Sequence, residues 1–340
     1  MSNNKLSILV VRNDKMGDLM LTWPALSWLR KNLPEAKISL LVSKNLREIA
    51  KLCHHVNDVI CDDKLKNLKD ILSSYHFDAS ISLFSTFRIA YLLKKINIPI
   101  RMAPKTKIAQ FFYNHAIRQN RSKSLKPEYE YNVDLINEFF KIINLENVED
   151  IEEPPYLKFQ NEDHSKIKDD FIKKYNLMDD KKIIFINPCT GGSSKTLTKS
   201  DWIRICEGLR GFDNYNFVLH YAKNQQDLCE DIFKSVSKKV NLTKIIPTTN
   251  LIEMSKNISA SDVFISGSTG PLHVAGALNK KTVGFYPSKV SSTMLRWQTI
   301  NNFANRLDFV DTGKARRSIT IDMNKTILEI QKHIHKSEVI

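Results

Sequence analysis

The sequence predicts an α/β protein made of two doubly wound domains. Short apolar segments alternate with helical segments along the chain, a pattern typical of parallel sheets covered by helices. The alternation is interrupted at residues 151–155, Ile-Glu-Glu-Pro-Pro, and then starts again. Proline disfavours both helix and central strand, so we expect a domain boundary at this segment. A chain of 340 residues is long enough for two such domains.

The expected elements follow from the periodicity of the apolar residues. Expected strands are residues 8–11, 38–42, 59–60 and 79–83 in the first half, and 183–186, 217–219, 263–265 and 282–285 in the second. Expected helices include residues 19–31, 202–209, 227–236 and 251–258, and a final amphipathic helix at 324–335. We therefore expect domains at 1–155 and 156–320, a terminal helical segment at 321–340, and a cleft between the two halves.

Composition excludes several classes of protein. The chain is 42% hydrophobic and 26% charged, which is typical of a soluble globular protein. No apolar run approaches the roughly 18 residues that span a bilayer, and the polar start leads into a run too short for a secretory signal. The five cysteines are odd in number and scattered, which favours reduced thiols. We expect a cytoplasmic protein.

No metal site is predicted. Cys53, His54, His55 and Cys61 lie close together in the sequence, but no second group with ligand spacing follows them. The chain also contains no Asp-x-Asp pair, whose two carboxylates are the usual ligands of a divalent ion. We expect neither a metal nor another cofactor.

The net charge of +14 is unevenly distributed. Residues 88–126 contain no Asp or Glu and ten basic residues: Arg88, Lys94, Lys95, Arg101, Lys105, Lys107, Arg118, Arg121, Lys123 and Lys126. Such a run attracts phosphates on nucleic acid, anionic lipid or a phosphorylated glycan; the alternative is a solvated lysine-rich surface. The aromatic residues 111–113 within it are predicted to be core, not a platform for stacking bases.

The turn at residues 12–18, Arg-Asn-Asp-Lys-Met-Gly-Asp, lies between the first expected strand and the first expected helix. Ligands of open parallel sheets bind at the carboxyl ends of the strands. Asp18 is therefore the first candidate for chemistry. The alternative is that Asp18 only caps the following helix.

Two turns of the second half also follow expected strands. Residues 188–195, Pro-Cys-Thr-Gly-Gly-Ser-Ser-Lys, could offer backbone amides and the charge of Lys195 to a diphosphate, or could be a flexible turn. Residues 266–273, Ser-Gly-Ser-Thr-Gly-Pro-Leu-His, run into a helix whose first amides could stabilise an anion. His273 could add a hydrogen-bond donor there, or could be structural.

Three motifs together resemble glycosyltransferase family 9, the heptosyltransferase family of lipopolysaccharide assembly. They are residues 12–18 followed by Leu-Thr-Trp-Pro-Ala-Leu at 21–26, the loop 190–195, and Ser-Thr-Gly-Pro-Leu-His-Val-Ala at 268–275. The resemblance implies the GT-B fold, with two Rossmann-like domains facing a central cleft. It implies an acceptor on the N-terminal domain, an ADP-sugar on the C-terminal domain, and a last helix that packs back on the first domain.

The resemblance also implies roles for single residues. Asp18 matches the general base and Lys195 the lysine that contacts the donor phosphates. The other positions implied for the donor are Thr190, Gly191, Ser268, Thr269, Gly270 and His273. We expect acceptor contacts from Arg12, Lys15, Gly17, Arg88, Arg101 and Arg118. Ser268 replaces the usual Asp that reads the donor sugar. The glutamate for the nucleotide ribose is not plainly present, and Gln225, Gln226 and Asp227 lie in that region.

The predicted activity is inverting, metal-independent transfer of a heptose-like sugar from an ADP-linked donor. The expected acceptor is an anionic lipopolysaccharide core or related surface glycan on a lipid, with a peripheral contact at the cytoplasmic face of the inner membrane and no nucleic acid. One alternative is a family relative that uses a UDP- or GDP-linked sugar. The other is a non-catalytic protein that binds anions or nucleic acid. The presence of chemically functional turns in both Rossmann-like halves argues against this alternative.

Overall fold

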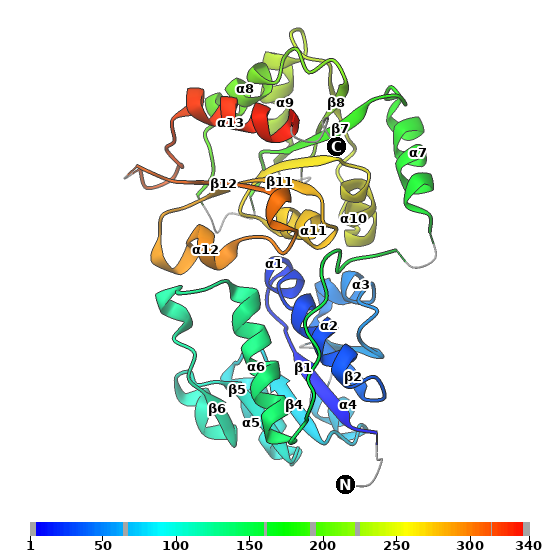
Figure 1. The fold of residues 1–340 in the computed structure, drawn as a ribbon, viewed down its shortest axis with the longest axis vertical. Coiled ribbons are helices and arrows are strands. Elements are labelled where there is room, and N and C mark those ends of the chain that lie inside the picture. The colour runs from blue at the N-terminus through cyan, green and yellow to red at the C-terminus, as the bar shows by residue number, and fades with distance from the viewer. Residues whose placement is uncertain are drawn as a thin grey trace. The chain divides into compact units, whose positions relative to one another are not determined.

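The computed structural model describes residues 5–63, 67–159, 162–190, 195–221, 225–313 and 315–335. The chain divides into two compact units, Met1–Tyr156 and Leu157–Ile340 (Figure 1). Within the described residues each unit contains one parallel six-stranded sheet with helices packed against it. The predicted α/β class is confirmed for both halves.

The first unit has the strand order β3-β2-β1-β4-β5-β6. Its strands are β1 (Ser7–Val11), β2 (Lys37–Ser43), β3 (Asp58–Asp62), β4 (Ala79–Ser82), β5 (Ile100–Pro104) and β6 (His115–Ile117). Its helices are α1 (Met16–Met20), α2 (Trp23–Asn32), α3 (Arg47–Ala50), α4 (Leu68–Ser73), α5 (Phe87–Lys95) and α6 (Glu128–Ile142), with short 3₁₀ turns η1 (Lys44–Leu46), η2 (Ile108–Phe112) and η3 (Arg121–Lys123).

The order of the first sheet reverses between β1 and β4. β1 pairs with β2 on one side and with β4 on the other, in both cases parallel. In a doubly wound sheet the loops that leave two such strands diverge to opposite faces and leave a crevice for ligand. The loops after β1 and β4 therefore enclose the position where chemistry is expected.

The helix predicted at residues 19–31 is two helices, α1 and α2. α1 ends at Met20, and α2 begins at Trp23 with Pro24 in its first turn. Proline lacks a backbone N–H and its fixed φ suits the start of a helix, so a new helix begins here. The break gives α1 its own direction directly after the β1 loop, while α2 packs against α6.

The second unit has the order β12-β11-β10-β7-β8-β9, which reverses between β10 and β7. Its strands are β7 (Lys182–Asn187), β8 (Tyr215–Leu219), β9 (Leu242–Lys244), β10 (Val263–Gly267), β11 (Lys281–Tyr286) and β12 (Arg306–Val310). Its helices are α7 (His164–Tyr175), α8 (Lys199–Gly208), α9 (Gln226–Val236), α10 (Leu251–Ser259), α11 (Gly270–Ala277), α12 (Met294–Trp297) and α13 (Met323–His335), with 3₁₀ turns η5 (Val290–Ser292) and η6 (Phe303–Asn305).

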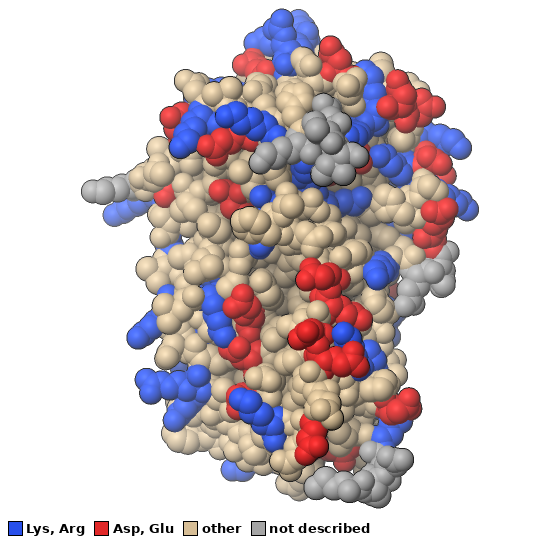
Figure 2. Space-filling view, viewed as in Figure 1, with Lys and Arg blue, Asp and Glu red and all other residues tan. Residues whose placement is uncertain are grey.

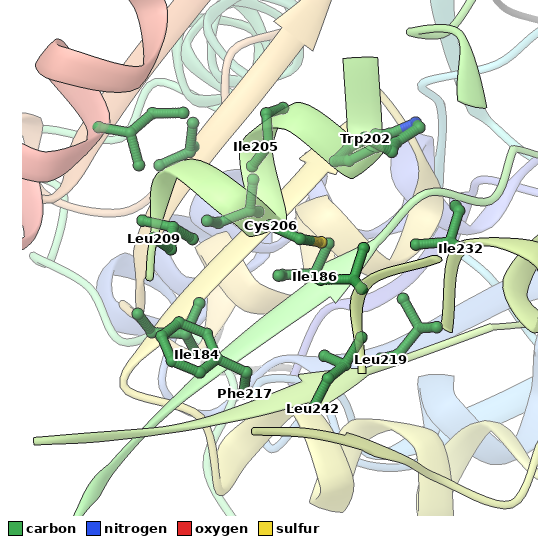
Figure 3. Packing of buried hydrophobic residues seen from close by; sticks show 14 of the residues in the cluster. Ile184, Ile186, Trp202, Ile205, Cys206, Leu209, Phe217, Leu219, Ile232 and Leu242 are labelled. Atoms are coloured by element: carbon green, nitrogen blue, oxygen red, sulfur yellow. The ribbon is translucent and has the colours of Figure 1, made fainter. Parts of the chain in front are cut away.

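A buried apolar cluster joins helix α8 to the second sheet. Figure 3 shows Ile205 and Cys206 of α8 with Ile186 of β7 and Leu219 of β8. Burying an aliphatic side chain of this kind stabilises the fold by about 1.5–3 kcal/mol. This packing fixes the plane of the sheet whose carboxyl edge carries the second group of candidate residues.

The last helix, α13, packs within the second unit. Ile330 and Ile334 belong to the second core, and Gln331 Nε2 donates to the carbonyl of Gly208 at 2.7 Å. A Cβ on Gly208 would lie 2.5 Å from Ile327, so the glycine lets α13 approach α8 closely. Within the second unit α13 contacts α8 and β12; its packing on the first domain, which the resemblance implies, stays a prediction.

Among the described residues, no helix has both the length and the apolar character that crossing a bilayer requires.

Candidate active site

Arg12, the first residue after β1, lies at the centre of a group of carboxylates. Its side chain is only 2% exposed. Its Nη2 donates to Asp18 Oδ1 at 2.5 Å, and its Nε donates to Asp14 Oδ1 at 3.0 Å. Its Nη1 lies 3.5 Å from Glu128 Oε1. One guanidinium thus holds a carboxylate of the β1–α1 loop, one from the first turn of α1 and one from α6.

The same guanidinium ties the carboxyl ends of β1 and β4 to α6. Its Nη1 lies 3.3 Å from the carbonyl of Leu83 and 3.3 Å from Oδ1 of Asn132. Glu128 also accepts from Arg121 Nη1 at 2.7 Å, so a chain of charged groups runs from Asp18 through Arg12 and Glu128 to Arg121. Planar guanidinium donors suit such a multidentate arrangement.

Burial alone would lower the pKa of Arg12, but Asp14, Asp18 and Glu128 raise it above the ordinary value, so the guanidinium stays charged. Burial raises the pKa of Asp14 to about 6, against the opposing effect of Arg12. The Asp14 carboxylate is therefore largely ionised at neutral pH.

The structure bears on one expectation and one alternative for this segment. Arg12 was expected to contact the acceptor, but it is buried and its donors are committed to internal partners. Asp18 does not cap α1: the cap position is Lys15, and the Asp18 carboxylate turns back to Arg12. Within the described part of the chain, Oδ2 of Asp18 accepts no hydrogen bond, and the side chain is 13% exposed. That oxygen can accept a further hydrogen bond.

The other expected acceptor residues occupy different places. Lys15 is exposed at the start of α1, and Gly17 lies in its first turn. Arg88, at the start of α5, pairs with Asp62 at the end of β3. These three lie at the carboxyl edge of the first sheet.

Arg101 lies at the opposite, amino edge, near the beginning of β5. Its Nε donates to the carbonyl of Phe112 at 3.0 Å, and its Nη1 donates to the carbonyl of Ile98. The acceptor contact expected from Arg101 stays a prediction, but its guanidinium holds the backbone at the sheet edge opposite to the loops after β1 and β4.

Arg118 lines a basic pocket at the carboxyl ends of β5 and β6. The cavity has a volume of about 410 Å³ and is lined by Pro104, Lys105, Thr106, Gln110, Arg118, Gln119, Asn120, Arg121 and Ser122. Among the described residues, Lys105 and Arg118 form no ion pair. Figure 2 shows Lys and Arg side chains over the part of the first unit where Figure 1 draws β6. The pocket is suited to an anionic group.

A buried polar chain fixes the carboxyl edge of the second sheet. Asn187 Nδ2 donates to Ser266 Oγ at 3.0 Å, and Ser266 Oγ lies 3.1 Å from Thr269 Oγ1 at the start of α11. His220 Nδ1 lies 3.3 Å from Asn187 Oδ1; because that oxygen can only accept, Nδ1 carries the proton. The chain joins the ends of β7, β8 and β10 to α11.

The start of α11 offers backbone donors. Ser268 N donates to the carbonyl of Phe285 at 3.0 Å, which holds the loop before the helix. Thr269 is the cap residue and Gly270 begins the helix, whose first amides have no partner within it. His273 is buried one turn further along. The arrangement places a helix dipole at the switch point of the second sheet.

Lys195 is held by a residue that the sequence did not single out. Its Nζ lies 3.0 Å from Oδ2 of Asp311, which directly follows β12 and whose side chain is fully buried. Burial raises the pKa of Asp311, but the amides of Thr320 and Gly313 together with Lys195 outweigh it, and the pKa lies below its ordinary value. Asp311 is thus a fixed anion that orients the lysine.

Thr190 lies three residues after β7, and its carbonyl accepts from Gln225 Nε2 at 2.7 Å. Of the three residues considered for the ribose, Gln225 is thereby tied to this loop, whereas Gln226 and Asp227 lie in the first turn of α9. Gly191 lies outside the described residues.

Glu128, Asn187, His220 and Asp311 were missed because each acts through a partner distant in sequence. Asp14 was missed although its partner Arg12 is only two residues away. Asp14 and Asn187 carried a usable signal, since both lie at the end of an expected strand. No grouping of three or more His, Cys, Asp or Glu side chains suited to a metal occurs in the described part of the chain.

A family model described as glycosyltransferase family 9 (heptosyltransferase) matches residues 65–320. The chain belongs to this family. A Haemophilus influenzae protein assigned to the glycosyltransferases is 34% identical over 322 residues, 93% of this chain and 92% of the relative. Lipooligosaccharide heptosyltransferase 2 of Campylobacter jejuni is 26% identical over 320 residues, again 93% and 92%.

Solved structures confirm the fold. The Escherichia coli ADP-heptose lipopolysaccharide heptosyltransferase II has a TM-score of 0.78 at 18% identity, with 98% of this chain and 100% of that chain covered. A family 9 glycosyltransferase of Veillonella parvula has a TM-score of 0.80 at 16% identity, with 99% of each chain covered. The protein is a glycosyltransferase with a GT-B-like arrangement of two Rossmann-like units.

Proposed function

We propose that this family 9 glycosyltransferase transfers a heptose from ADP-heptose to an anionic lipopolysaccharide-core or related glycolipid acceptor, with inversion and without a metal. The observation that carries the proposal is the Asp18 carboxylate at the switch point of the first sheet, with one oxygen held by Arg12. The heptosyltransferase relative from Campylobacter jejuni supports the choice of sugar.

The acceptor step uses Asp18 as general base. Its Oδ2 takes the proton of an acceptor hydroxyl while that oxygen attacks the anomeric carbon of the donor. Such assistance contributes about 10²–10⁴-fold to the rate. The bond from the anomeric carbon to the diphosphate oxygen breaks in the same displacement, so the anomeric configuration inverts. Arg12 acts as a positioning residue, since it is buried and reaches the substrate only through Asp18.

The leaving nucleoside diphosphate gains negative charge as its bond breaks. Lys195, oriented by Asp311, and the first amides of α11 supply positive potential for that charge. His273, one turn into α11, adds a further donor for that charge. Lysine and helix dipole thereby take the place of a divalent ion.

The basic pocket of the first unit binds the negatively charged part of the acceptor. Lys105 and Arg118 have no ion-pair partner among the described residues, so an acidic or phosphorylated sugar of the acceptor can pair with them. Lys15, Gly17 and Arg88 at the same sheet edge would contact the remainder of the acceptor. The acceptor is lipid-linked, so we also propose a peripheral contact of the enzyme with the cytoplasmic face of the inner membrane.

Ser268 favours a second candidate donor. A serine hydroxyl cannot make the two-oxygen, charge-assisted contact to sugar hydroxyls that the usual Asp makes. The alternative is therefore a family member that uses another nucleotide sugar. A site that hydrogen-bonds a sugar hydroxyl discriminates between sugars far more strongly than a site that does not. The preference of the enzyme among donor sugars is therefore the property to measure.

The test is a thermal-shift screen of the purified enzyme with ADP, UDP and GDP and with their sugars. We expect the largest rise in melting temperature with ADP-heptose, because a ligand that binds only the folded state stabilises it. The anomeric configuration of the product, read by NMR, should be inverted, and EDTA should leave turnover unchanged. A retained configuration, or activity lost to EDTA and restored by magnesium, contradicts the mechanism.

Competition between ADP-heptose and other nucleotide hexoses, on wild type and on Ser268→Asp, separates the two donor candidates. An altered preference that Ser268→Asp returns to heptose supports the second candidate. A strong wild-type preference for ADP-heptose, unchanged by the substitution, shows that the serine is neutral.

A further inference from the structure

Helix α5 and the turn η2 together expose an unusual number of large apolar side chains. Phe87 is 57% exposed, Ile108 66% and Phe111 75%, and Tyr91 is also exposed. Phe111 was predicted to be core from its place in the aromatic run 111–113; of that run, Tyr113 is buried. Large aromatic side chains in water mark an interaction site when they are grouped.

These side chains lie on one surface, because α5 and η2 pack against each other. The ring of Phe112 makes edge contacts with Phe87, at 5.2 Å between centroids, and with Tyr91, at 5.8 Å. The opposite face of α5 carries Ile89 and Leu93, which are fully buried in the first core. The core is therefore complete without the outward aromatic residues, and we call this outward side the α5–η2 surface.

Cations interleave with the aromatic rings of the α5–η2 surface. Lys94 lies over the ring of Phe112 at 5.7 Å, and Lys95 lies over the ring of Tyr91 at 5.9 Å. Lys107 is exposed just before η2. The sequence has no carboxylate from residue 79 to residue 127, and Asp62, which does reach the start of α5, is neutralised by Arg88. The net charge of the surface is positive.

Aromatic and lysine side chains together suit a lipid surface better than a protein partner. The cores of protein interfaces are depleted of lysine. At a bilayer surface, aromatic rings settle at the headgroup level while lysine stems bury and their ammonium groups reach lipid phosphates. Each basic residue near an anionic membrane strengthens binding about fivefold.

We propose that the α5–η2 surface docks on a bilayer that contains anionic phospholipid, with Phe87, Tyr91, Ile108 and Phe111 inserted among the headgroups. The inference rests on the proposed function for its lipid-linked acceptor. Gln110 of η2 also lines the basic pocket, so docking brings the mouth of that pocket beside the lipid headgroups. The membrane contact and the acceptor contact thus share one turn of the chain.

Flotation of the full-length protein with vesicles tests the surface without measuring turnover. Wild type should float with vesicles of phosphatidylcholine and phosphatidylglycerol, less so as salt is raised, and remain unbound with phosphatidylcholine alone. Two combined variants test the surface. One removes aromatic rings (Phe87→Ser with Phe111→Ser), and the other removes charges (Lys94→Gln, Lys95→Gln and Lys107→Gln together). Each variant should lower the partition coefficient for anionic vesicles by about tenfold or more. Circular dichroism should report unchanged folds, because these side chains are exposed.

Matched controls lie on the second unit. Phe303 is 85% exposed with Arg306 over its ring, so Phe303→Ser removes an aromatic residue beside a cation. Lys166→Gln, Lys173→Gln and Lys238→Gln remove three exposed lysines. Both controls should bind vesicles as wild type does.

The proposal is overturned if wild type fails to float with anionic vesicles, or if the controls lose binding as much as the α5–η2 variants. It is also overturned if sedimentation velocity shows a dimer that Phe87→Ser with Phe111→Ser dissociates while vesicle binding persists. Transfer to a soluble acceptor fragment should be unchanged in the α5–η2 variants. Failure of transfer in wild type counts against the proposed function and leaves the flotation result standing.

Discussion

The Nη2 atom of Arg12 lies 2.5 Å from Oδ1 of Asp18, six residues further along the chain. Arg12 directly follows the first strand and Asp18 lies in the first turn of α1, so this bond closes the loop at the switch point of the first sheet. It also leaves the second oxygen of Asp18 for a substrate. The first turn of α1 therefore presents a carboxylate whose orientation is set by a buried cation.

The first prediction concerns that cation. Arg12→Lys keeps the charge but loses the planar set of donors that reaches three carboxylates and a carbonyl. The free energy of unfolding should fall by about 2–4 kcal/mol, since breaking a buried charge network leaves unpaired groups. Turnover should fall more than donor affinity. Urea unfolding and steady-state kinetics measure both, with exposed Arg210→Lys as control; an unchanged kcat would remove the positioning role.

The second prediction concerns the lysine of the second unit. Lys195→Ala should raise the donor Kd and lower kcat, each by about tenfold or more, because the cation interacts with the diphosphate before and during bond cleavage. Asp311→Asn should weaken donor binding less, since the lysine remains but loses its fixed partner. Lys199→Ala, which breaks an exposed pair with Asp231, is the control. Unchanged donor binding in Lys195→Ala would move the diphosphate elsewhere.

The third prediction is a pH dependence of stability. Burial lowers the pKa of His220 to about 4, whereas an unfolded histidine titrates near 6.5. Between these values the unfolded state binds more protons, so the free energy of unfolding falls as pH falls from about 6.5 to 4, by about 3 kcal/mol from this residue. His220→Gln should flatten that slope in urea unfolding, and exposed His76→Gln should not. An equal slope in all three proteins would show that His220 is not the source.

The fourth prediction concerns the packing of α11. A Cβ on Gly276 would lie 2.6 Å from Cβ of Thr299, a fully buried residue. Gly276→Ala gains up to about 1 kcal/mol in helix propensity, but the overpacking costs about 1–3 kcal/mol. We expect a net loss of stability by thermal unfolding, whereas exposed Ser235→Ala on α9 should change little. A stabilised Gly276→Ala would mean that α11 can shift freely.

The sequence predicted the central strands of both sheets, because their apolar residues are buried on both faces and form continuous runs. It missed β5, β6, β9 and β12, which lie toward the sheet edges. β5 contains Arg101 and ends in Pro104, β6 and β9 have three residues each, and β12 is half-buried. These segments form strands because a neighbouring strand pairs with them, and the local sequence pattern does not show that pairing.

The candidate site was predictable where it follows a strand and not where it depends on distant partners. Asp18 and Lys195 follow expected strands and could be chosen from position alone. The burial of Arg12 could not, because its partner Glu128 is 116 residues away. The same holds for Lys195 and Asp311, which also lie 116 residues apart. Arg101 looked like part of a basic run because the sequence does not show which sheet edge a residue occupies.

The most direct test of the account is Asp18→Asn, with turnover and donor Kd measured on the same preparation. The amide keeps the shape of the side chain but cannot accept the acceptor's proton. We predict a fall in turnover of about 10²-fold or more with donor affinity nearly unchanged. Turnover above about a tenth of wild type would contradict the assignment of Asp18 as the base.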